Sequence, residues 1–355
     1  MKKILSGLIF RALRSIETWI VIGFFLFASV YISYMRISNP YNGFSTDPGR
    51  RFESLDVSAQ DAYMLYAEAL PEDVYYKLDT EDDEVQYEIK LLFGMIDFIQ
   101  AIQIILFIIY LPIFMGRMFS DGTIKNLIAG GHSKGKIYLS SLLFSIVLDI
   151  AMMVTGICLF MLMCLILKWH PPVYIPVVLM MFLISVLITV TFSSVSIAAL
   201  FISKKRTVAF IMSFLLMFII YFVPVSIPAV LIVGTQNINV NGENIKRIRK
   251  IRDEAPYDLE EHFLLSEFNY RYTYHGEEII FFEDSFLPRP VKTAVLIMSY
   301  ADPAMIFHTN ESFNISYYMM YRDGLMAVNI ASNIFWITLS SFCGIIVFRR
   351  KEIRC

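Results

Sequence analysis

Six long apolar runs constrain this chain more than any other feature of its sequence. Each contains 18 to 31 residues, and a helix of about 20 apolar residues is long enough to cross the hydrocarbon core of a bilayer. Because 57% of the residues are hydrophobic and only 17% are charged, a soluble domain is excluded. The sequence predicts an all-α polytopic membrane protein with six transmembrane helices and two extracellular α/β insertions. The predicted spans are 18–35, 91–115, 137–167, 174–202, 208–233 and 326–348.

Charged residues are distributed unequally between the two sides of these spans. Of the 32 acidic residues, 27 fall in two intervals, 36–90 and 234–325. The four short intervals on the other side carry 15 of the 30 basic residues and only three acids, Glu17, Asp121 and Glu352. Lys and Arg concentrated in short loops mark the cytoplasmic side. We therefore expect a multi-pass protein of the cell membrane, with cytoplasmic N- and C-termini and two extracellular regions, 36–90 and 234–325.

The segments between and beside the spans give further expectations. Segment 1–17 has an apolar stripe opposite Arg11 and Arg14 and is expected to be an interfacial helix, and 349–355 is expected to be a cytoplasmic tail. His275-Gly276, between runs of strand-forming residues, predicts a hairpin in the second extracellular region. The acidic run 79–84 lacks the ligand order of a calcium loop and is interpreted as a solvated face.

The interval 116–136 is the longest polar stretch on the cytoplasmic side. Ile124, Leu127 and Ile128 follow the i, i+3, i+4 spacing of one helix face. Asp121 lies just before this helix, where a carboxylate can cap exposed N–H groups, and Gly130-Gly131 ends it. Two interpretations fit this pattern: a short amphipathic helix that inserts into a groove on another protein, or a tight solvated loop between two spans.

The stretch SDGTIKNLIAGGHSKGKIYLSSLL resembles the loop between the second and third spans of ABC-2-type transporter permeases. Asp121, the run Gly122 to Leu127, Ser133, Lys134, Ile137 and Tyr138 match that loop. Two features depart from it: Asp121 replaces the commoner Glu, and Gly130-Gly131-His132 replaces a stretch that usually contains proline.

The resemblance implies a transmembrane permease subunit rather than an enzyme. A separate ATP-binding ABC subunit would bind ATP and Mg and dock on this cytoplasmic coupling loop, and this chain would hold no cofactor of its own. A second permease chain, identical or related, would complete the transport path in the lipid bilayer. A short re-entrant segment is expected within 234–325, where 291–298 is apolar but too short to cross the membrane. The docking residues implied are Asp121, Gly122, Thr123, Ile124, Lys125, Asn126, Leu127 and Ile128.

The same stretch contains a partial phosphate-binding motif. Gly130-x4-Gly135-Lys136 fits most of the pattern, but Ile137 stands where Ser or Thr should hold magnesium, and no strand is expected before it. We interpret the match as chance. No arrangement of residues predicts hydrolysis, redox chemistry, a metal site or a nucleic-acid partner.

Several polar residues fall inside the predicted spans, where ionisable groups are costly. Asp149 lies near the middle of 137–167. One interpretation is a polar lining of a translocation path between two protomers, and the other is hydrogen bonding between packed helices. The residues concerned are Asp97, Gln100, Gln103, Asp149, Asn329 and Asn333.

Three classes of function follow from these observations. The first is an ABC permease subunit, with export of a peptide or of an amphiphilic or hydrophobic substrate. The second is an ion-coupled secondary transporter that uses Asp97 and Asp149, although no internal repeat of the kind typical of that class is present. The third is a membrane-anchored sensor or scaffold whose extracellular domain binds a ligand. The loop resemblance favours the first.

Overall fold

The computed structural model places the chain in two compact units, each of which is considered by itself. The first comprises Met1–Gly43, Asp83–Ile219 and Ile330–Cys355, and the second comprises Phe44–Asp82 and Ile220–Asn329. The structure describes residues 1–38, 83–168, 175–223, 247, 250–251, 259–264, 269–280, 289–305, 307 and 324–350. Most of the predicted region 36–90 and the acidic segment 79–82 lie outside these residues.

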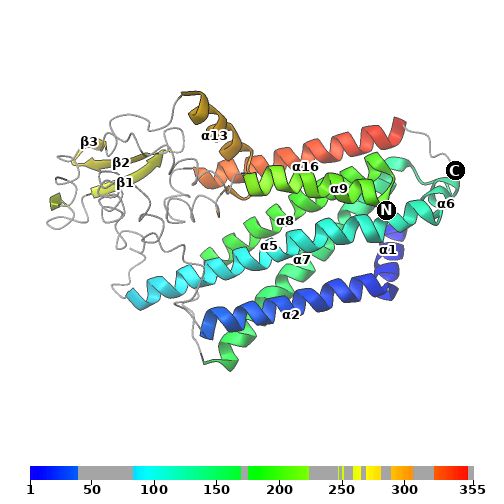
Figure 1. Cartoon of the computed structure of the whole chain (residues 1–355), viewed down its shortest axis with the longest axis horizontal. Helices are drawn as coiled ribbons and strands as arrows, with labels where there is room; N and C mark the ends of the chain where they lie inside the picture. Colours follow the sequence, from blue (N-terminus) through cyan, green and yellow to red (C-terminus); the bar gives the residue numbers. More distant parts are fainter. Residues whose placement is uncertain are drawn as a thin grey trace. The chain divides into compact units, whose positions relative to one another are not determined.

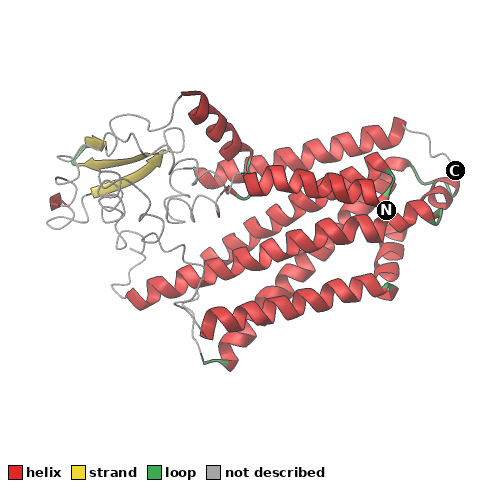
Figure 2. Cartoon of the chain, in the orientation of Figure 1, coloured by secondary structure: helices red, strands yellow, loops and turns green. Residues whose placement is uncertain are grey.

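The first unit is built from helices (Figures 1 and 2). Five of them contain stretches long and apolar enough to cross a membrane: Ile16–Met35, Gly94–Ser120, Lys134–Ile166, Leu179–Ser203 and Leu325–Arg350. The predicted helical, polytopic architecture is confirmed to this extent. The helices are α1 (Lys2–Arg14), α2 (Ile16–Ser38), α5 (Asp83–Ser120), α6 (Thr123–Ala129), α7 (Lys134–Ile166), α8 (Ile175–Ser203), α9 (Arg206–Met217) and most of α16 (Leu325–Arg350).

The predicted span 208–233 is described only in its first part. It begins as α9 and continues into a short π-helix, η3 (Phe218–Phe222). This apolar helix, Arg206–Tyr221, is shorter than the five candidate spans. Residues 224–233 lie outside the described part of the chain, so the sixth span stays a prediction.

Burial divides the helices into inner and outer ones. α8 is the most enclosed and contains no charged residue, and α5 is the next most enclosed. By contrast, α2, α7 and α16 carry exposed large apolar side chains, such as Phe27, Leu165 and Phe342. Large apolar patches of this kind are costly in water. They are suited to contact with lipid, which agrees with a membrane-embedded bundle.

Four helices of the first unit converge on an aromatic cluster formed by Phe119, Tyr138, Phe201 and Phe348. The Phe201 ring centroid lies 5.3, 5.1 and 4.8 Å from those of Phe119, Tyr138 and Phe348, each in an edge-on arrangement. Edge-to-face aromatic pairs are favoured by the charge distribution of the rings. The cluster therefore fastens the ends of α5, α7, α8 and α16 beside α6. α1 and α6 lie at this same end of the bundle (Figure 1).

The described part of the second unit contains a three-stranded antiparallel sheet in the order β1-β2-β3. The strands are β1 (Leu259–Leu264), β2 (Asn269–Tyr274) and β3 (Glu277–Ile280). His275 and Gly276 both have positive φ, 47° and 83°, as a two-residue turn between twisted strands requires. The predicted His275-Gly276 hairpin is therefore confirmed, whereas β1 was not predicted.

The apolar segment 291–298 is part of α13 (Arg289–Ala301). Asp302 follows this helix, and its carboxylate accepts a 2.9 Å hydrogen bond from the Ala304 N–H. The segment expected to be re-entrant is therefore helical, and its re-entrant placement stays a prediction.

Candidate functional site

The helix predicted in the loop 116–136 is present as α6, between α5 and α7. Gly122 takes a left-handed conformation with φ 75° just before it. Asp121 Oδ1 accepts hydrogen bonds from the Thr123 N–H at 3.0 Å and from the Thr123 hydroxyl at 2.6 Å. A carboxylate at this point satisfies one of the N–H groups that a helix leaves free and complements its positive end. The predicted capping by Asp121 is confirmed.

The other end of α6 is closed by glycine. Gly131 has φ 82°, a conformation that favours glycine over residues with a Cβ. The N–H groups of Gly131 and His132 donate to the carbonyl oxygens of Ile128 and Leu127, both at 3.0 Å. This pair of bonds is a Schellman motif, which fixes the length of the helix. Helix α6 rather than a strand precedes Gly135 and Lys136, in agreement with a chance match to the phosphate-binding pattern.

The apolar side chains of α6 fall into two groups. Ile124 is only 1% exposed, so it packs into this chain's own core instead of facing outward with the predicted docking residues. Leu127 and Ile128 are half-buried, and Asn126 is exposed. Lys125 is also half-buried and Ala129 is exposed. The surface that α6 can offer to a partner therefore includes Lys125, Asn126, Leu127, Ile128 and Ala129, and Ile124 anchors the helix to the bundle.

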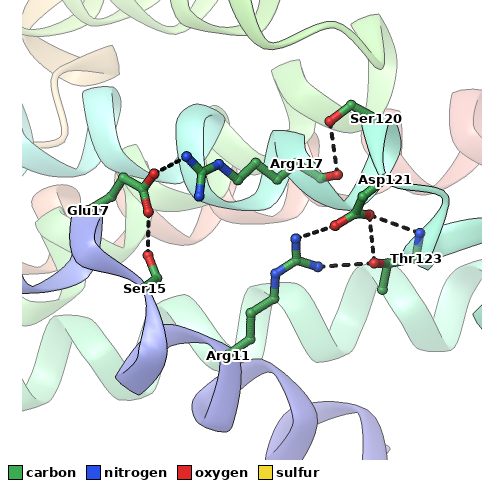
Figure 3. Close-up of polar contacts among 7 residues, drawn as sticks. All are labelled: Arg11, Ser15, Glu17, Arg117, Ser120, Asp121 and Thr123. Atoms are coloured by element: carbon green, nitrogen blue, oxygen red, sulfur yellow. Dashed lines mark hydrogen bonds and ion pairs between the residues drawn. The ribbon is translucent and has the colours of Figure 1, made fainter.

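An ion pair ties this loop to the N-terminal helix (Figure 3). The Arg11 guanidinium pairs with Asp121 Oδ2, and its second nitrogen donates to the Thr123 hydroxyl at 3.0 Å. Partial burial raises the pKa of the Asp121 carboxyl, but hydrogen bonds from Thr123 and Arg11 outweigh that effect and hold the pKa below its ordinary value. Asp121 is therefore ionised at neutral pH and joins α1 to the start of α6.

A second ion pair lies beside the first. Arg117, near the end of α5, pairs with Glu17 in the first turn of α2, and the Ser15 hydroxyl donates to the other Glu17 oxygen at 2.6 Å (Figure 3). The sequence predicted an interfacial helix in 1–17 with Arg11 and Arg14 opposite its apolar stripe, and it did not predict either ion pair. A signal was present, because Glu17 and Asp121 are two of only three acids among the 15 cations of the four short basic intervals.

The far end of the loop is also anchored. Ser133 caps α7 by accepting a 3.3 Å hydrogen bond from the Lys136 N–H. The Lys134 ammonium donates to the Arg349 carbonyl oxygen of α16 at 3.2 Å. The loop that carries α6 is thus fixed to α1 on one side and to α16 on the other.

Only some of the polar residues predicted to lie within the spans contact one another. Gln103 of α5 donates from Nε2 to the Asp149 carbonyl oxygen at 2.9 Å and to Asp149 Oδ1 at 3.2 Å. Ser193 of α8 donates to the same Oδ1 at 3.2 Å. We call Gln103, Asp149 and Ser193 the buried polar cluster. It connects three helices, α5, α7 and α8.

The other predicted path residues have separate surroundings. Asn333 accepts a 2.6 Å hydrogen bond from the Thr191 hydroxyl of α8. Asn329, in the second unit, donates to the Pro303 carbonyl oxygen at 2.7 Å. Asp97 is half-buried on α5. Five of the predicted residues are completely buried, with 0% exposure: Gln100, Gln103, Asp149, Asn329 and Asn333. In this arrangement they do not face an open path.

Sequence reasoning missed the hydroxyl groups of α8. Thr191, Ser193, Ser194 and Ser196 bond to α16, α7, α16 and α9, respectively. The available signal was the run TVTFSSVS, which places five hydroxyl residues among eight positions of an apolar helix. Small hydroxyl residues of this kind let helices approach closely and bond across the contact.

Comparison with protein-family models, characterised proteins and solved structures found no match. Within the described residues, no group of three or more His, Cys, Asp or Glu side chains could hold a metal ion.

Proposed function

We propose that this chain is the transmembrane permease subunit of an ABC transporter of the ABC-2 type, and that an ATP-binding subunit docks on α6. The observation that carries the proposal is the construction of α6. It is a short helix between two candidate spans, capped at both ends and anchored by Ile124, with Asn126, Leu127 and Ile128 at its surface. The resemblance of 120–143 to the corresponding permease loop supports the same assignment.

A docking helix must pass movement on to the spans, and the contacts of α6 suit that purpose. Arg11 ties its first turn to α1, and Arg117, at the end of α5, is tied to Glu17 of α2. Directly after α6, Ser133 starts α7. Displacement of α6 by an ATP-binding subunit would therefore displace α1, α5 and α7 together rather than deform a loose loop. ATP and Mg would be bound by that partner.

The course of the chain supports a sixth crossing. α9 starts, and α16 ends, at the end of the first unit where α6 lies (Figure 1). Because α16 runs toward that end, we infer that a crossing which begins with α9 carries the chain to the opposite end before α16. In this proposal the crossing corresponds to 208–233, and the number of crossings is six. An even number leaves both termini on one side, which the distribution of Lys and Arg assigns to the cytoplasm.

Six spans form half of a transport path in this class, so a second permease chain is part of the proposal. The apolar character of the enclosed helices favours a peptide or an amphiphilic or hydrophobic substrate, and the direction proposed is export. Regions 36–90 and 234–325 would lie outside the cell.

The proposal is tested by weakening the exposed apolar side of α6. Leu127→Asp and Ile128→Asp place charges where a groove would have to bury them, and loss of an apolar anchor typically costs more than about 1 kcal/mol, roughly fivefold in Kd. We expect each change to reduce the affinity for the purified ATP-binding subunit at least fivefold. Lys136→Ala, an exposed position on α7 outside this surface, is the control and should bind normally.

Unchanged affinity in both Asp variants, with the chain correctly folded, would contradict docking at α6. Ile124→Asp is unsuitable for this test because Ile124 belongs to the chain's own core.

A further inference from the structure

Asp149 is a buried acid for which the proposed docking mechanism gives no role. It lies on α7, fully enclosed, and only one of its two carboxyl oxygens is used within the described residues. Oδ1 accepts from both Gln103 and Ser193, whereas Oδ2 has no partner there. The Gln103 Oε1 atom and both ends of the Gln100 amide are likewise buried without a partner among those residues. Buried polar atoms are normally satisfied, so this group of atoms requires an occupant or a proton.

The helices around Asp149 supply no positive charge near it. α8 has no charged residue, and the nearest cation on α7 is Lys136, thirteen residues away, or about 20 Å of helix. On α5 the nearest cations to Gln103 are Lys90 and Arg117, thirteen and fourteen residues away. The charged residues of the other helices are confined to their ends: Glu17 and Arg36 of α2, Arg206 of α9, Arg349 and Arg350 of α16, and Lys2, Lys3, Arg11 and Arg14 of α1.

The one other charged side chain in the middle of these helices has the wrong sign. Asp97 lies on α5, six residues from Gln103, and as an acid it supplies no positive charge to Asp149. An ionised carboxylate is costly in such surroundings. Buried groups avoid this cost by becoming neutral.

We propose that Asp149 is a proton-binding site, and that it carries a proton on Oδ2 when α5, α7 and α8 are packed as in this structure. The carbonyl oxygen of the neutral acid is then Oδ1, which keeps its hydrogen bonds from Gln103 and Ser193. The acid O–H then requires an acceptor. Gln103 Oε1 is buried without a partner among the described residues and belongs to the same amide that donates to Asp149. Release transfers the proton from Oδ2 to water and leaves a carboxylate.

Release of the proton has a structural consequence. A carboxylate at this position needs water or a cation around it, and either must enter between α5, α7 and α8. The neutral acid therefore favours the packed arrangement and the ionised form favours separation of the three helices. By linkage, the packed arrangement is favoured at low pH and weakened as pH rises through the titration of Asp149 in the packed state.

Infrared difference spectroscopy on the purified full-length chain in lipid nanodiscs tests the proton directly. At neutral pH in sodium-free buffer, the wild-type spectrum should contain a carboxylic-acid C=O band that shifts in D2O. This band should be missing from Asp149→Asn and retained in Asp97→Asn, the control. Coincident wild-type and Asp149→Asn spectra in this region would show an ionised Asp149 and overturn the proposal.

Two further measurements keep the test decisive if Asp149→Asn folds poorly. Gln103→Leu removes a donor to Oδ1 and should raise the frequency of the same C=O band; an unchanged band would contradict the assignment. Adding sodium to the wild-type chain in choline buffer should leave the band in place, and its loss would identify a sodium site instead of a proton site. These spectra do not depend on any ATP-binding subunit, so the outcome is separate from that of the docking experiment.

Discussion

Arg11 and Asp121 are 110 residues apart in sequence and form the contact that fixes the start of α6. Their side chains are 30% and 41% exposed, so solvent screens the pair and its contribution to stability is small. The pKa of Asp121 lies below its ordinary value. The contact therefore stabilises the folded loop above the ordinary pKa of Asp, about 3.9, and is lost as pH falls through the folded-state pKa. At neutral pH the contact positions α6 and contributes little to the stability of the fold.

Arg11→Ala separates these two roles. We expect the free energy of unfolding to fall by less than about 1 kcal/mol, while affinity for the ATP-binding subunit falls several-fold because α6 loses its attachment to α1. Thermal unfolding and equilibrium binding measure the two quantities. Arg14→Ala is the matched control, because the Arg14 guanidinium lies over the Phe10 ring at 4.2 Å and not on the loop. Equal binding by the Arg11 and Arg14 variants would refute a positioning role for Arg11.

The close approach of neighbouring helices depends on a few glycines. A Cβ added to Gly344 of α16 would lie 2.6 Å from the Tyr138 ring of α7. Tyr138 is fully buried in the aromatic cluster and cannot move aside. The position therefore sets how closely α7 and α16 pack beside α6.

We expect Gly344→Ala to lower the free energy of unfolding by about 1–3 kcal/mol, the usual cost of overpacking. Gly23→Ala on α2 is the control, since a Cβ there meets nothing within 4 Å, and alanine is the better helix former. Thermal unfolding in detergent compares the two variants. A loss of stability at Gly23 equal to that at Gly344 would show that the Tyr138 contact is not responsible.

The sequence predicted the helices far better than their contacts. Hydropathy placed the span 137–167 close to α7, Lys134–Ile166, and 174–202 close to α8, Ile175–Ser203, because apolar length alone decides where a chain can cross lipid. α5 begins at Asp83, eight residues before the predicted span 91–115, since a helix continues beyond the apolar segment without a hydropathy signal. Capping by Asp121 was predictable because it involves residues that are close in sequence.

The contacts between helices were predicted less well because they depend on tertiary packing. Nothing local connects Arg11 to Asp121, or Ser193 to Asp149. Ile124 has the same hydrophobic spacing as Leu127 and Ile128, and only packing against neighbouring helices decides that Ile124 faces the core. Two members of the buried polar cluster, Gln103 and Asp149, were predicted from the sequence. The third, Ser193, was not.

The proposed function requires that α6 lies in the cytoplasm and that an ATP-binding subunit covers it. A chain without its four natural cysteines, Cys158, Cys164, Cys343 and Cys355, allows single cysteines to be introduced as reporters. Asn126 is exposed on α6, and Lys136 is exposed on α7 outside the docking surface. Both positions should share one side of the membrane, and only the first should be covered by the partner.

The decisive measurement is labelling of Asn126→Cys with a membrane-impermeant thiol reagent, with Lys136→Cys as the matched control. We expect no labelling of either position in intact cells and labelling of both in inside-out vesicles stripped of the ATP-binding subunit. Adding that subunit back should protect Asn126→Cys and leave Lys136→Cys reactive. Labelling of Asn126→Cys in intact cells, or equal labelling of the two positions with the subunit bound, would contradict the claim.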